Sequence, residues 1–193
     1  LVDRRITLLG EVGYEAKIVD VESYALGAAV ASFYPHKGDE TVCCINIGAS
    51  HLQMCAVKNG KVIYTKDHNF GMDALIQDLT ILYSQERSQI EQQLTDGTLP
   101  ETWKQDAYPM FLANLHQNIN RALQLYISAS GEARPSSLLI CGGGGHLTSL
   151  PEDLTADLGI EVSSFNPFTD MAIAANVNQG DLEQVSGQLI IAA

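Results

Sequence analysis

The sequence predicts an α/β domain with a mixed sheet that is interrupted by a helical insertion. Residues 41–67 contain three strand-like segments, and Asn59-Gly60, a dipeptide typical of two-residue hairpin turns, joins the last two. A later apolar strand over Leu138–Cys141 runs into four glycines and then into an amphipathic helix. Between these parts, apolar residues recur with a helical period from about Trp103 to Ala129, which indicates a long helix.

The chain opens with an amphipathic helix, which Gly10 or Gly13 is expected to end. A buried strand over Ala16–Val21 and a helix over Glu22–Phe33 are expected next, and the polar residues Pro35–Asp39 are the expected boundary between two lobes. The remaining expected elements are strands Thr41–Ile47, His51–Val57 and Lys61–Asp67, a helix that starts at Phe70–Asp73, a helix Ser84–Leu94, the long helix, the glycine loop with a helix to Leu158, a strand Ile160–Phe165, a turn at Asn166–Phe168, and a last amphipathic helix from about Asp181 to the end.

Composition limits the classes of partner. The formal net charge is −12 with only 11 Lys and Arg, so the surface would repel nucleic acid, which is not an expected partner. No apolar run approaches the roughly 20 residues that span a bilayer, and direct membrane insertion is not expected. No Cys/His spacing resembles a zinc site. The cysteines all lie in apolar strand-like segments and are expected to be buried free thiols of a reducing cytoplasm: Cys43, Cys44, Cys55 and Cys141.

Two loops of small residues, far apart in the sequence, are the candidate ligand site. The turn between the first two strands can lay backbone N–H groups and a hydroxyl around phosphates, as an anion nest does. The glycine loop lets the backbone come within contact distance of a ligand and is expected to take the nucleoside end, with the turn at residue 166 closing the far side. The candidate binding residues are therefore Asn46, Gly48, Ala49, Ser50, Gly142, Gly143, Gly144, Gly145, His146 and Asn166.

Other nucleotide folds and catalytic motifs fit less well. No G-x-x-x-x-G-K-[ST] string is present, which excludes a P-loop enzyme. A dinucleotide-binding fingerprint that starts at Gly142 would need a glycine where Leu147 stands, and Glu161 begins the next strand rather than ending it. Ser50 lacks the G-x-S-x-G elbow of an acyl nucleophile. No carboxylate base is found at a suitable loop of the cleft.

Further strings along the chain carry a family resemblance. They are Ile18–Leu26 (IVDVESYAL), Asn46–Ala49 (NIGA), Gly60–Thr65 (GKVIYT), Arg121–Tyr126 (RALQLY), the glycine loop, and Asn166–Phe168 with Met171, Ala172 and Val177-Asn178. In this order they resemble the PilM family, the actin-like and FtsA-like cytoplasmic proteins of type IV pilus assembly. The resemblance runs across essentially the whole chain, and the ordered series is more specific than any one string.

The resemblance implies an actin/Hsp70-like ATPase fold, of which this chain would be a fragment, mostly the second lobe with a helical insertion. Gly48, Ala49 and Ser50 would correspond to the second phosphate loop, and Gly143–Gly145 to the adenosine loop. The implied division is residues 1–36 as the tail of the first lobe, 37–70 and 136–170 as the sheet-based core of the second lobe, 71–135 as the insertion, and 171–193 as a return helix toward the first lobe.

Two departures from the family pattern predict weaker ATP binding and slower ATP hydrolysis than in other actin-like proteins. Actin-like proteins usually carry Asp in the second phosphate loop, where it helps to hold hydrated Mg²⁺, and the neutral Asn46 stands there. Where relatives often show Lys-Glu in the insertion, this chain has Leu112-Ala113. ATP with Mg²⁺ is the implied cofactor, bound weakly, and we predict no efficient catalysis, at most a weak ATPase in the complete protein.

The expected function is a cytoplasmic scaffold of the type IV pilus inner-membrane platform, peripheral to that membrane through its protein partners. The implied partners are the N-terminal cytoplasmic tail of PilN, whose groove would lie mostly in the missing N-terminal part, and other pilus platform proteins. Self-association is also expected, because an isolated lobe would expose an apolar face. The alternatives are an active ATPase or phosphotransferase of the same superfold and an FtsA-like filament-forming division protein.

Overall fold

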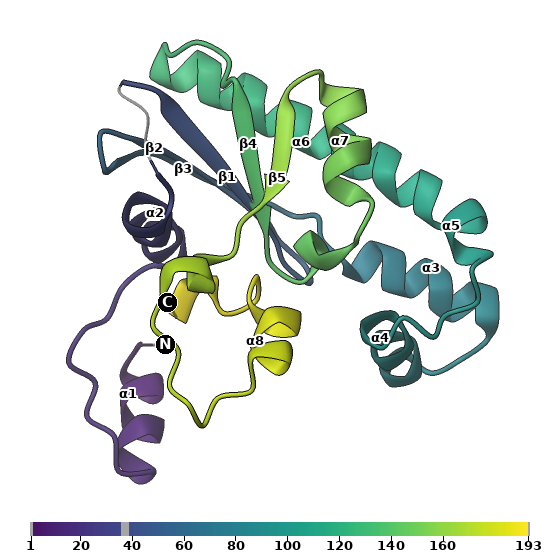
Figure 1. Cartoon of the computed structure of the whole chain (residues 1–193), viewed down its shortest axis with the longest axis horizontal. Helices are drawn as coiled ribbons and strands as arrows, with labels where there is room; N and C mark the ends of the chain where they lie inside the picture. Colours follow the sequence, from purple (N-terminus) through teal and green to yellow (C-terminus); the bar gives the residue numbers. More distant parts are fainter. Residues whose placement is uncertain (1, 36–38, 193) are drawn as a thin grey trace.

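A five-stranded mixed sheet organises the computed structural model, which describes residues 2–35 and 39–192 (Figure 1). The strand order is β3-β2-β1-β4-β5. The strands are β1 (Thr41–Ile47), β2 (Leu52–Lys58), β3 (Lys61–His68), β4 (Ser137–Cys141) and β5 (Glu161–Ser164). The first three form an antiparallel meander, and β4 and β5 are parallel to β1. Asn59 and Gly60 both take positive φ, so the predicted two-residue hairpin between β2 and β3 is confirmed.

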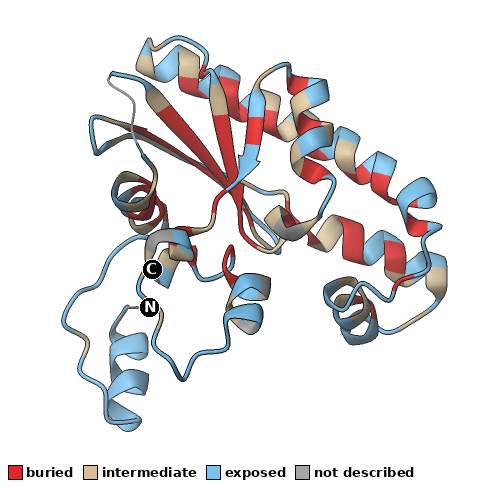
Figure 2. Ribbon diagram, viewed as in Figure 1, coloured by how far each residue is buried: buried red, intermediate tan, exposed pale blue. Residues whose placement is uncertain are grey.

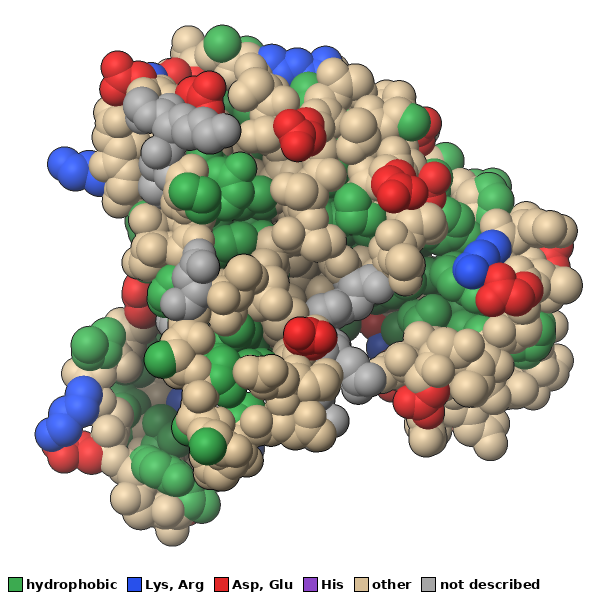
Figure 3. All heavy atoms as spheres, viewed as in Figure 1, with side chains coloured by type: hydrophobic (Ala, Val, Ile, Leu, Met, Phe, Trp, Pro, Cys, Tyr) green, Lys and Arg blue, Asp and Glu red, His purple; other side chains and the backbone are tan. Residues whose placement is uncertain are grey.

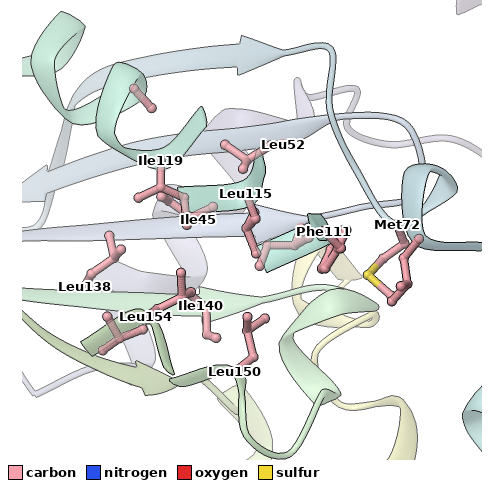
Figure 4. Packing of buried hydrophobic residues seen from close by; sticks show 14 of the residues in the cluster. Ile45, Leu52, Met72, Phe111, Leu115, Ile119, Leu138, Ile140, Leu150 and Leu154 are labelled. Atoms are coloured by element: carbon pink, nitrogen blue, oxygen red, sulfur yellow. The ribbon is translucent and has the colours of Figure 1, made fainter. Parts of the chain in front are cut away.

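Helices cover both faces of the sheet, and each face has its own core. On one face α6 (Tyr108–Ser130) and α7 (Leu150–Leu158) pack against inward residues of β1, β2 and β4. Figure 4 shows this packing, with Ile119 and Leu115 of α6 lying over Ile45 of β1. On the other face α2 (Glu22–Phe33) packs against β2 and β3. The buried residues concentrate along the strands and the helix faces turned toward them (Figure 2).

The four thiols are buried and unpaired, as expected from the sequence. Neighbouring Cys43 and Cys44 point to opposite faces because side chains alternate along a strand. Cys44, Cys55 and Cys141 lie together on the α2 face, with the Sγ atoms of Cys44 and Cys141 3.7 Å apart. Burial raises the pKa of the Cys43 thiol well above its ordinary value, which keeps it in the unreactive protonated form.

The insertion consists of α3 (Asp73–Tyr83), α4 (Arg87–Thr95), the short α5 (Trp103–Asp106) and α6. Ser84 ends α3 in the left-handed conformation, and a capping box between Glu86 and Gln89 starts α4. Arg87 forms ion pairs with Asp73 of α3 and, at 2.6 Å, with Glu91. The long α6 lies along the sheet, whereas α3 to α5 extend to one side of it (Figure 1), although their buried residues belong to the same core.

Three sequence predictions are wrong in detail. The long helix is divided at Ala107, because Pro109 has no N–H group to donate to the carbonyl four residues before it, and α6 starts anew at Tyr108 with the proline in its first turn. The last helix is shorter than expected: α8 covers Gln179–Val185, and after Gly187 the chain forms a 3-10 turn, η3 (Ile190–Ala192). The chain after the glycines does not pass directly into a helix, because it first forms the 3-10 turn η1 (Gly144–His146) and α7 begins only at Leu150. The turn expected at Asn166–Phe168 is present as η2 (Pro167–Asp170), which follows β5.

The predicted buried strand over Ala16–Val21 is also wrong: this segment is irregular and exposed, with Ile18 86% exposed. Its backbone has no neighbouring strand among the described residues, and a strand needs one to satisfy its N–H and C=O groups. The preceding helix, α1 (Val2–Glu11), buries none of its residues. Apolar side chains consequently show on the surface around α1, at the lower left of Figure 3.

The division into lobes stays a prediction. Helix α2, expected in the tail of the first lobe, packs on the same sheet as the rest of the chain. Of the expected boundary Pro35–Asp39, residues 36–38 lie outside the described part. Within the described ranges, no helix is both long enough and apolar enough to cross a bilayer.

Candidate functional site

The turn between β1 and β2 has its carbonyl groups turned toward the insertion. The N–H groups of Met72 and Asp73, at the start of α3, donate to the C=O of Gly48 and of Ala49 at 2.9 and 2.8 Å. Gly71 lies against the same carbonyls, and a Cβ there would stand 2.5 Å from the Gly48 oxygen. Among the described residues, the N–H groups of Ala49 and Ser50 have no acceptor within the chain. The turn therefore has the polarity of an anion nest.

Polar side chains surround this turn in a pocket of about 340 Å³, which we call the turn pocket; its lining is Glu22, Asn46, Gly48, Ala49, Ser50, His51, Gln53 and Asp67. The Ser50 hydroxyl lies 2.8 Å from His51 Nδ1. Two carboxylates line the pocket, and its described lining contains no Lys or Arg, so the backbone N–H groups are its donors for an anion.

The glycine loop touches the β1–β2 turn. Gly142 takes φ +82°, and a Cβ there would collide with Asn46 Oδ1 and stand 2.6 Å from the Ile47 carbonyl oxygen. A Cβ at Gly144 would stand 2.5 Å from Ile47 Cγ2. The contact arises because β1 and β4 are parallel neighbours, with Asn46 opposite Cys141, so both strands end at the same edge of the sheet. The two loops of the sequence prediction therefore lie side by side.

The glycine loop is partly occupied by the chain itself. The Gly142 N–H donates to the C=O of Gly187 at 2.9 Å, and the Gly145 N–H donates to the C=O of Gly142 at 3.1 Å. These two N–H groups are engaged, contrary to the expectation of an open glycine backbone. Gly143 has open space where a Cβ would stand. His146 lies in η1, and its side chain lies outside the described part of the chain.

Two hollows lie near the glycine loop, one beside Leu147–Ser149 just after the loop and one that includes Gly145. The larger, about 470 Å³ and here called the insertion hollow, lies between the insertion and the start of α7; its lining includes Leu94, Leu99, Trp103 and Lys104 on one side and Leu147, Thr148, Ser149 and Glu152 on the other. The smaller, about 330 Å³, is lined by residues that include Gly145, Ser164, Asn166 and Ser186. The larger volume lies within the range of small-molecule sites, and its mixed apolar and polar lining suits a purine.

Asn166 lies in the smaller hollow, beside the glycine loop but not in the larger one. Its Oδ1 accepts a hydrogen bond of 2.9 Å from the Phe168 N–H and so caps η2. The side chain is thus engaged in the local turn, and its predicted role in ligand binding stays a prediction.

The structure adds residues that the sequence prediction did not include. Gln53, only 8% exposed, hydrogen-bonds Asn46 on one side and Glu22 on the other. Asp67 lies opposite Gln53 in the β2–β3 register, and Asn46 lies opposite Gln53 in the β1–β2 register. Counting back from the Asn59-Gly60 turn would pair Gln53 with Lys66. The register shifts by one residue between Ala56 and Val57, so the turn alone could not have identified Asp67. Two carboxylates thus line the pocket, although no loop carboxylate was expected.

The sheet order, the helices on its two faces and the paired loops define an actin-like ATPase fold. Solved structures with this fold are similar to the chain at low sequence identity. EutJ, the ethanolamine utilization protein of Carboxydothermus hydrogenoformans, matches with a TM-score of 0.69 and 16% identity over 95% of this chain and 56% of its own. MreB5 of Spiroplasma citri bound to AMPPNP matches with a TM-score of 0.58 and 12% identity, over 84% and 59%.

The chain belongs to the PilM family. The family described as type IV pilus assembly protein PilM matches residues 1–193. A PilM-PilN type IV pilus biogenesis complex contains a chain that is similar with a TM-score of 0.83 and 19% identity, over 99% of this chain and 55% of that chain. This chain therefore spans somewhat more than half the length of these three solved chains.

Proposed function

We propose that the complete protein is a scaffold of the type IV pilus inner-membrane assembly platform, which binds ATP between the two loops and docks the cytoplasmic tail of PilN. Family membership supports the pilus assignment, and the similar PilM-PilN complex supports PilN as the partner. We propose further that the protein is cytoplasmic, lies at the inner membrane through its partners, and contacts other platform proteins.

One observation carries the nucleotide part of the proposal, which is the contact between Gly142 and Asn46. That contact brings the β1–β2 turn and the glycine loop to one edge of the sheet. The phosphates would lie against the unpaired N–H groups of Ala49 and Ser50, and the adenosine would pass the glycine loop into the insertion hollow. An AMPPNP-bound relative with the same fold supports nucleotide as the ligand class.

The donor set fits Mg²⁺ only in part. Asn46 offers one neutral oxygen, which is a weaker ligand than carboxylate for a hard cation. Among the described residues no group of three or more His, Cys, Asp or Glu could hold a metal ion. We therefore propose that any Mg²⁺ arrives with the phosphates of ATP, and that nucleotide supports the conformation of a scaffold rather than rapid turnover.

A second candidate is an active ATPase of the same fold. The presence of Glu22 and Asp67 in the turn pocket favours it, because a carboxylate there could accept a proton from an attacking water. Glu22 already accepts a hydrogen bond from Gln53, which makes Asp67 the stronger candidate base.

Isothermal titration of the full-length protein with ATP–Mg²⁺, and then with a synthetic PilN N-terminal peptide, separates the two candidates when phosphate release is measured on the same samples. Peptide binding without turnover supports the scaffold. Turnover that an Asp67→Asn substitution abolishes, without peptide binding, supports the ATPase. Light scattering on the chain of residues 1–193 tests the expected self-association of the isolated lobe through the exposed apolar residues around α1.

A further inference from the structure

Three polar side chains form a hydrogen-bonded series across the turn pocket. The Asn46 Nδ2 donates to Gln53 Oε1 at 3.0 Å, and the Gln53 Nε2 donates to Glu22 Oε2 at 3.1 Å. The series joins β1, β2 and the first turn of α2, and it lies on the face of the sheet that α2 covers. We call it the amide relay.

The carboxylate at the end of the relay fixes the direction of every bond in it. An ionised carboxylate only accepts hydrogen bonds, so Gln53 must turn its NH₂ group toward Glu22 and its oxygen toward position 46. Gln53 is buried, so both ends of its amide need partners. Asn46 must then donate through Nδ2, which turns its Oδ1 away from Gln53 and against Gly142, where a Cβ would collide with it.

We propose that Glu22, acting through Gln53, is a positioning residue that aims the Asn46 carbonyl oxygen at the junction of the two loops and specifies a neutral side chain at position 46. The proposal rests on the proposed nucleotide site and says which chemistry that site presents. At position 46 the site offers its ligand an uncharged acceptor, the Asn46 carbonyl oxygen. The site would therefore select a nucleotide whose Mg²⁺ is held by the phosphates of the nucleotide itself.

An acidic residue at position 46 is incompatible with the relay as it stands. An ionised carboxylate has no proton to donate to the Gln53 oxygen, so an Asn46→Asp substitution would place two acceptors face to face beside a buried amide. Glu22→Gln removes the conflict, because a glutamine at position 22 can accept or donate, which leaves Gln53 free to turn its NH₂ group toward the new carboxylate. Whether an acidic residue fits at position 46 therefore depends on the direction of the hydrogen bonds that Gln53 makes, and not only on its charge.

The test is a double-mutant cycle on the full chain, read by urea unfolding. Asn46→Asp should lower the folding equilibrium constant about tenfold or more in the wild-type background, and by no more than about threefold in the Glu22→Gln background. Asp67→Asn is the matched control, because Asp67 lines the same pocket and carries the same charge but lies outside the relay. It should rescue Asn46→Asp much less than Glu22→Gln does.

Titration with ATP measures a second quantity, the Mg²⁺ dependence of ATP affinity, which would not change if Glu22 only stabilised the fold. The Asn46→Asp/Glu22→Gln chain should gain a Mg²⁺-dependent increase in ATP affinity of about tenfold, since a correctly turned carboxylate binds Mg²⁺ better than an amide. Asn46→Asp alone should gain much less. If no variant binds ATP, the proposed function fails, whereas the unfolding cycle still decides whether the relay exists.

Additive unfolding costs of Asn46→Asp and Glu22→Gln would overturn the proposal. Equal rescue by Asp67→Asn would also overturn it, because the effect would then be relief of charge repulsion. Should Asn46→Asp not fold, NMR on Glu22→Gln keeps the proposal testable. The Asn46 side-chain NH₂ signals should move although the substituted residue is separated from Asn46 by Gln53, and unmoved signals would refute the relay.

Discussion

Replacement of Gly142 by alanine is the perturbation that most directly tests the contact between the two loops. Gly142 takes φ +82°, a conformation that costs a residue with a Cβ about 1–2 kcal/mol. The new methyl group would also collide with Asn46 Oδ1 and stand 2.6 Å from the Ile47 carbonyl oxygen. Overpacking of this kind adds about 1–3 kcal/mol. The two terms together predict a loss of about 2–5 kcal/mol in the free energy of unfolding.

Gly143→Ala is the matched control for this prediction. Gly143 takes φ −60° and ψ −35°, and nothing lies within 4 Å of the position a Cβ would occupy. Alanine in this helical conformation should be neutral or stabilise the chain by about 0.4–1 kcal/mol. Urea unfolding of the two variants and the wild type, followed by circular dichroism, measures the difference. If Gly142→Ala is as stable as Gly143→Ala, the two loops do not pack as described.

Three further predictions concern the turn, the thiols and pH. Gly71→Ala should lower the free energy of unfolding by about 1–3 kcal/mol, because a Cβ there would collide with the Ala49 carbonyl, whereas Gly10→Ala has open space and should not; equal urea midpoints would contradict this. The four buried thiols should not react with Ellman's reagent in the native chain and should all react in denaturant, and rapid native labelling would refute their burial. Burial, and then the charges of Arg121 and Lys66, lowers the pKa of His68 below 6.5, so the unfolded chain binds more protons and stability falls as pH drops below that value. His68→Gln should remove that part of the pH dependence of the urea midpoint, and Arg121→Gln should raise the His68 pKa measured by NMR; an unchanged slope in His68→Gln would contradict the assignment.

Local signals in the sequence predicted most of the sheet and its hairpin. The Asn59-Gly60 turn requires positive φ at both residues, and both take it. The turn does not fix the whole pairing of β2 and β3, because a register shift at Ala56/Val57 places Asp67, and not Lys66, opposite Gln53. The strand predicted over Thr41–Ile47 is present as β1, and the alternation of its side chains places Cys43 and Cys44 in the two different cores.

Elements whose formation depends on residues far away in the sequence could not be predicted from local signals. The Ala16–Val21 segment has the composition of a buried strand, but composition does not say whether a neighbouring strand is present, and among the described residues none lies beside it. The division of the long helix could have been predicted from Pro109, because its missing N–H group is a local effect.

In the candidate site, too, the features set by local sequence could be predicted and those set by distant packing could not. Two glycine-containing strand ends predicted two loops at one edge of the sheet, and the structure places them in contact. The insertion hollow, by contrast, depends on how α4 and α5 stand relative to Leu147–Ser149, which is set by packing over the whole insertion. The hydrogen bond from Gly142 to Gly187 likewise joins segments that no local pattern relates.

An NMR titration of the full chain with ATP–Mg²⁺ tests most directly whether the two loops form one nucleotide site. The backbone amide signals of Ala49 and Ser50 in the β1–β2 turn, and of Gly143 and Gly144 in the glycine loop, should all move with a single common Kd. Movement of one pair alone, or of neither, would contradict a shared site.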